Sequence, residues 1–93
     1  MYLSGELDHH GAKNAADIIG EALDEYLPRD CAIDLSGLNF MDSSGIALIL
    51  RISRRMGRTG GRAWVEAPAP QPLRVLDASG IDRLVPVAVG KRG

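Results

Sequence analysis

The sequence predicts a small α/β domain with a mixed, mostly parallel sheet and helices packed mainly on one face. Two observations carry this prediction: apolar runs typical of strands alternate with apolar-striped segments typical of helices, and the links between them are short. This alternation favours parallel strands joined by right-handed crossovers. A chain of 93 residues holds one core, which we place in residues 1–89, with 90–93 as a flexible tail.

The first predicted elements are an extended segment, a loop and an amphipathic helix. Residues 1–4 are extended, and a loop follows at 6–11. Apolar residues then recur at helical spacing over residues 12–27, and Pro28 prevents the helix from continuing.

A buried strand and a second helix form the centre of the predicted domain. The strand covers residues 31–35 and is closed by a turn at 36–39. The helix starts near Ser44 and ends before a group of glycines at 57–61. The residues that we expect to be buried are Ile33, Leu35, Ile46, Ile49, Leu50, Val65 and Leu76.

The last predicted elements are a strand at 63–65, a loop at 67–70, a short helix at 72–79 and a final strand at 84–89. A proline suits the first turn of the short helix, and Gly80 suits the position just after its end.

Composition excludes several classes of protein. The net charge of −1 argues against a general nucleic-acid binder. Cys31 is the only cysteine and lies in an apolar run, which indicates a buried thiol and rules out an internal disulfide. No apolar run is long enough to span a membrane, so we expect a cytoplasmic protein that does not bind a membrane.

The segment from Phe40 to Ile46 joins the central strand to the second helix and contains an acid and two hydroxyls, Asp42, Ser43 and Ser44. A helix start has unpaired N–H groups and a partial positive charge, so such a segment suits caps or phosphates. From local chemistry alone, these serines are either caps or a modifiable switch.

Enzymatic and metal-binding interpretations are weaker. Asp42, Ser44 and a histidine would make a triad, but the nucleophile elbow of serine hydrolases is missing. A metal site would have to draw on Glu6, Asp8, His9 and His10, with no second cluster of ligands. A polar loop before the first helix is the favoured interpretation, and we expect neither a metal nor another cofactor.

Four arginines lie along one side of the second helix: Arg51, Arg54, Arg55 and Arg58. They are typical of a solvated face whose positive charges favour the helix C-terminus. A surface for docking a partner is the alternative.

Three separated motifs resemble those of the STAS domain family, and within it those of sporulation-type anti-sigma factor antagonists. They are Gly5 to His10, Asp34 to Gly45 and Val75 to Ile81. The resemblance implies that the unmodified protein binds an anti-sigma factor that is also a serine kinase, and so releases a sigma factor. It also implies that the kinase phosphorylates Ser44, that a phosphatase reverses the modification, and that the chain itself needs no cofactor.

On this resemblance, we expect partner contacts at Asp8, His9, Asp42, Ser43, Ser44, Gly45 and Arg51. The alternatives are a STAS module of another system, such as a stress-signalling scaffold or a lipid-transport accessory, and a small serine hydrolase. Family members normally begin with an extra strand, whereas only four residues precede Gly5 here. We therefore expect a truncated first strand and an exposed sheet edge, and a monomer or a weak dimer through that edge.

Overall fold

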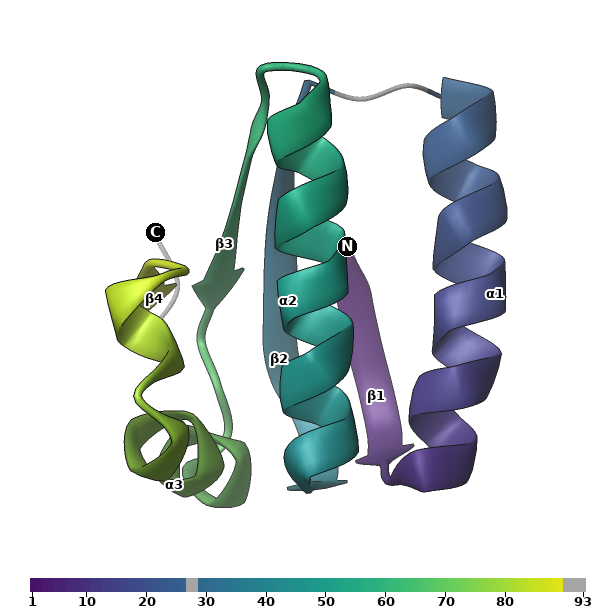
Figure 1. Cartoon of the computed structure of the whole chain (residues 1–93). Helices are drawn as coiled ribbons and strands as arrows, with labels where there is room; N and C mark the ends of the chain where they lie inside the picture. Colours follow the sequence, from purple (N-terminus) through teal and green to yellow (C-terminus); the bar gives the residue numbers. More distant parts are fainter. Residues whose placement is uncertain (27–28, 90–93) are drawn as a thin grey trace.

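A computed structural model describes residues 1–26 and 29–89 and contains one four-stranded sheet (Figure 1). The elements are β1 (Tyr2–Leu7), α1 (His9–Tyr26), β2 (Asp30–Met41), α2 (Ser43–Arg58), β3 (Arg62–Glu66), α3 (Pro70–Ser79), a 3₁₀ helix (Ile81–Arg83) and β4 (Val87–Ala88). The strands follow the order β1-β2-β3-β4, and each neighbouring pair is parallel. The α/β class and the mostly parallel sheet are confirmed, and the described residues contain no antiparallel pair.

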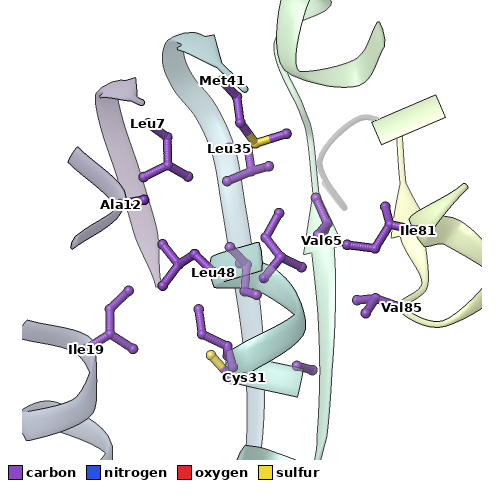
Figure 2. Close-up of a cluster of buried hydrophobic side chains, with 14 of the residues drawn as sticks. Leu7, Ala12, Ile19, Cys31, Leu35, Met41, Leu48, Val65, Ile81 and Val85 are labelled. Atoms are coloured by element: carbon purple, nitrogen blue, oxygen red, sulfur yellow. The ribbon is translucent and has the colours of Figure 1, made fainter. Parts of the chain in front are cut away.

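Helices α1 and α2 lie side by side over one face of the sheet, as predicted (Figure 1). Parallel strands in chain order, joined by crossovers of one hand, place their connecting helices on the same face. The side chains of β2 alternate between buried and more exposed positions, and its buried set begins with Cys31, Ile33 and Leu35. These side chains join residues of α1, α2 and β3 in a single hydrophobic cluster (Figure 2).

Five of the predicted core residues are buried: Ile33, Leu35, Ile49, Val65 and Leu76. Ile46 and Leu50 are only partly buried and pack against the edge of the cluster. Leu48 takes a place in the core that the prediction did not assign, because α2 also contacts α1 and so buries a second side of its surface.

The predicted loop at 6–11 is wrong. The strand β1 continues to Leu7, and α1 begins at His9. Gly11 belongs to the first turn of the helix, where a Cβ atom would lie 2.2 Å from the carbonyl oxygen of Glu6. The glycine therefore marks a close approach of helix and strand, and not a loop.

The predicted turn at 36–39 is also wrong, because β2 continues to Met41. Residues 37–41 pair with β1 from Ser4 to Leu7. Gly37, which suggested the turn, lies directly beneath the ring of Tyr2, where a Cβ atom would be 2.1 Å from the phenol oxygen. Pairing with a neighbouring strand has overridden a local signal for a turn.

The end of the chain is partly as predicted. Helix α3 ends at Gly80, which has a left-handed backbone conformation, as its predicted position requires. The strand predicted at 84–89 is reduced to the two residues of β4, and the 3₁₀ helix occupies part of the link before it. The flexible tail at 90–93 and the predicted helix end at Leu27 and Pro28 lie outside the described residues.

Candidate functional site

The starts of α1 and α2 lie next to each other because the strands that lead into them are paired. Leu7 at the end of β1 pairs with Met41 at the end of β2. Asp8 and Asp42 follow directly, and each precedes a helix. Two helix N-termini therefore meet at the carboxyl edge of a parallel sheet, the edge at which α/β folds usually place their sites.

Asp42 is the N-cap of α2. Its carboxylate oxygen Oδ1 accepts a hydrogen bond from the backbone N–H of Ser44 at 2.8 Å, and its carbonyl accepts one from Gly45 at 3.0 Å. Ser43 and Ser44 are consequently the first two residues of the helix. The N-cap is thus Asp42 and not one of the two serines, because the carboxylate before them already holds the free donor.

Asp8 has the corresponding position at α1. Its Oδ1 accepts from the N–H of Gly11, and its carbonyl accepts from the N–H of Ala12, each at 2.8 Å. Both aspartates predicted to contact a partner thus have a structural role as well, and both remain partly exposed.

The two serines line different grooves. Ser44 lies in a groove of about 410 Å³ between α1 and α2, together with His9 and Arg51. Ser43 lines a second groove, of about 470 Å³, between α2 and α3. Ser43 is exposed, whereas Ser44 is half-buried because the start of α1 lies beside it.

Gly45 is buried in the isolated chain, and its predicted contact with a partner stays a prediction. A Cβ atom there would lie 2.3 Å from Cγ of Met41 and 3.1 Å from Cδ2 of Leu7. The glycine lets the first turn of α2 pack directly on the ends of β1 and β2.

Gln71 of α3 holds the end of β2, a role for which the sequence analysis had no signal. Its Oε1 accepts from the N–H of Met41 at 2.8 Å, and its Nε2 donates to the Met41 carbonyl at 2.9 Å. Strand β3 has already ended at Glu66, so the side-chain amide takes the place of a neighbouring strand. Gln71 therefore fixes the backbone of the residue directly before Asp42.

The arginines of α2 have different surroundings. Arg55 forms an ion pair with Asp24 of α1, while Arg51 is exposed at the groove that contains Ser44. Among residues 1–26 and 29–89, no ion pair involves Arg51.

The geometry bears on the enzymatic and metal-binding alternatives as well. His9 and Ser44 line the same groove, but no hydrogen bond joins them within the described part of the chain. The carboxylate of Asp42 holds a backbone N–H and does not orient a histidine. The described residues contain no group of three or more side chains arranged to hold a metal ion, and none of their helices has the length and apolarity to cross a membrane.

Cys31 is buried in the core, as predicted. Burial raises the pKa of its thiol above the ordinary range, and the positive N-terminus opposes this rise only in part.

Comparisons with known proteins agree with the fold and with the family that the sequence resembles. The family model for the STAS domain matches residues 1–90. The anti-sigma F factor antagonist of Paenibacillus polymyxa is 37% identical over 89 residues, which are 91% of this chain and 73% of that protein.

Two solved structures are also similar. The anti-sigma factor antagonist SpoIIAA in its unphosphorylated form has a TM-score of 0.81 and 31% identity, covering 98% of this chain and 76% of its own. The Bacillus cell fate determinant SpoIIAA in the phosphorylated form has a TM-score of 0.71 and 28% identity, covering 98% of this chain and 79% of its own.

Proposed function

Because the chain belongs to the STAS domain family, we propose that it is an anti-sigma factor antagonist, the activity that the names of its relatives give for those proteins. In its unmodified form it binds an anti-sigma factor that is also a serine kinase, and the bound sigma factor is released. The kinase phosphorylates Ser44, the complex then separates, and a serine phosphatase restores the active form.

The observation that carries the proposal is the position of Ser44. Its hydroxyl belongs to the second residue of α2, at a groove shared with the start of α1. That the solved relative exists in an unphosphorylated and a phosphorylated form supports a switch of this kind.

The chemistry of the site suits such a switch. A phosphate adds a charge of about −1.5 to −2 near neutral pH. Within the chain, the N-terminus of α2 favours this charge. Against a docked partner, the phosphate adds bulk and repels acidic side chains. A change of about 3 kcal/mol, or about two decades in affinity, would be enough to separate the complex.

The test is capture of the partner from cells of the source organism with three baits: the native chain, Ser44→Ala and Ser44→Asp. We expect Ser44→Ala to retain an anti-sigma kinase persistently and Ser44→Asp to retain it poorly. The captured kinase is then incubated with ATP and each chain, and the peptide spanning residues 42–51 is mapped by mass spectrometry.

Ser43→Ala is the matched control, because it removes the neighbouring hydroxyl and leaves Ser44 in place. It should be phosphorylated like the native chain. Phosphate on Ser43, or phosphate that persists in Ser44→Ala, would overturn the assignment. Ester hydrolysis by the native chain that is lost in Ser44→Ala would instead favour a hydrolase.

A further inference from the structure

The groove that contains Ser44 has cations on both of its sides. Lys13 of α1 and Arg51 of α2 line it, and His9 lies at the same groove. Asp17 is the acidic residue of the lining. The two permanent cations outnumber this carboxylate, so the groove is suited to an anion.

Helix geometry places Arg51 within reach of Ser44. The two residues are seven positions apart, which is close to two turns, or about 10 Å along the axis on nearly the same face. Side chains on a helix lean toward its N-terminus, so the long side chain of Arg51 can extend back in the direction of Ser44. The intervening residues on that face are Ala47, whose side chain is small, and Leu48, whose side chain is buried in the core.

Neither cation is engaged by another group. Among residues 1–26 and 29–89, no ion pair involves Lys13 or Arg51, whereas Arg55 one turn further along α2 is paired with Asp24. The nearby carboxylate of Asp42 is directed to the N–H of Ser44 as a cap. The charges that face Ser44 are therefore available to a new anion.

We infer that a phosphate on Ser44 is bound within its own chain by Lys13 and Arg51, across the groove between α1 and α2. This inference rests on the proposed function, because it describes the phosphorylated form. The phosphate oxygens accept hydrogen bonds from the ammonium and the guanidinium, as charged pairs of this kind do.

Such binding explains how one phosphate can block the partner-binding surface at the groove between α1 and α2. In the unmodified chain, the Ser44 hydroxyl, Lys13 and Arg51 offer donors to an acidic partner surface. In the modified chain, the phosphate occupies both cations and fills the groove between the helices. The partner then loses its attractive contacts in addition to meeting a new negative charge.

The experiment uses the full chain with phosphoserine incorporated at position 44 during synthesis, so that no kinase is needed. The second pKa of the phosphate is measured by ³¹P NMR titration, in a His9→Gln background that removes the imidazole from the groove. We expect this pKa to lie below the usual value of about 6, by about half a pH unit for each cation. In the Lys13→Ala/Arg51→Ala double variant it should rise by about one pH unit.

Arg58→Ala is the matched control, because it removes the same charge from α2 at a position outside this groove. It should leave the lowered pKa unchanged. The N-terminus of α2 is common to all variants, so its own effect on the phosphate cancels in the comparison. Circular dichroism of the unphosphorylated variants shows whether each one folds. Urea unfolding gives a second test of the inference, because phosphorylation should raise the unfolding midpoint of the native chain more than that of the double variant.

Equal phosphate pKa values in the native and double-variant chains would overturn the inference, as would an equal response of Arg58→Ala. Either result leaves the proposed function intact, because the kinase reaction is not part of the measurement. Conversely, a lowered pKa stands even if the kinase assay fails to modify Ser44.

Discussion

Gly45→Ala is the substitution whose effect follows most directly from the packing at the start of α2. The added Cβ would lie 2.3 Å from Cγ and 2.8 Å from Sδ of Met41. Met41 is fully buried, and its backbone is held by β1 on one side and by Gln71 on the other. Neither the strand nor the helix start can move aside without breaking hydrogen bonds, so the methionine side chain must rotate within a filled core.

Overpacking of this kind costs about 1–3 kcal/mol, and alanine returns about 1 kcal/mol through its higher helix propensity. We therefore expect a net loss of up to about 2 kcal/mol in the free energy of unfolding. Gly57→Ala is the matched control in the same helix, because nothing lies within 4 Å of its added Cβ. This control should gain up to about 1 kcal/mol.

Urea unfolding followed by circular dichroism measures both variants. With a slope of about 1–2 kcal/mol per molar urea, the two midpoints should differ by about 1 M, with Gly45→Ala the lower. A Gly45→Ala midpoint at or above that of Gly57→Ala would refute the packing argument. If that stable variant also lost its partner, the glycine would be needed for the approach of another protein, as the sequence had suggested.

Three further predictions follow from the same region and from the core. Asp42→Asn should change the free energy of unfolding by no more than about 1 kcal/mol, because asparagine also caps helices. The same variant should be phosphorylated more slowly than the native chain. Normal phosphorylation per folded molecule would show that Asp42 has a purely structural role. Gln71→Leu should cost about 1–3 kcal/mol and speed hydrogen exchange at the Met41 amide, and unchanged protection of that amide would contradict the role given to Gln71. Because the pKa of Cys31 is raised, the folded chain keeps the thiol proton to higher pH than the unfolded chain does. The stability that the buried thiol contributes is therefore complete below the ordinary thiol pKa. It is lost as the pH rises through the raised pKa. Urea unfolding from pH 7 to 10 should therefore show a steeper loss of stability for the native chain than for Cys31→Ala, and equal slopes would contradict it.

The alternation of apolar patterns was enough to predict the fold class, the order of helices and strands and most of the core. It failed where long-range pairing decides the conformation. Gly37 and its polar neighbours favour a turn by local preference, yet they form the second half of β2 because β1 pairs with them. The loop predicted around Gly11 was wrong for the same reason, since only the folded chain shows how close the carbonyl of Glu6 lies to this glycine.

The candidate site was also predictable only in part. An acid and two hydroxyls between a strand and a helix identify the helix start from local chemistry alone, and the structure places Asp42 there as the cap. Gln71 and Lys13 carried no such signal, because their importance comes from what the fold places next to them. A residue that acts through a contact 30 positions away cannot be recognised before the topology is known.

Adjacent residues on a helix point about 100° apart, so two neighbouring serines at a helix start must face different surroundings. The sequence cannot say which surroundings these are, because they are set by the helices on either side of α2. Here α1 supplies Lys13 and His9 to the groove of Ser44, while α3 supplies Gln71 and Arg74 to the groove of Ser43. A phosphate on Ser44 would meet two free cations from two helices, and one on Ser43 would meet Arg74 beside largely apolar side chains. The choice of acceptor is thus coupled to the packing of α1 on α2, and substitutions of Lys13 should affect the phosphorylated form of Ser44 while leaving a phosphate on Ser43 unchanged.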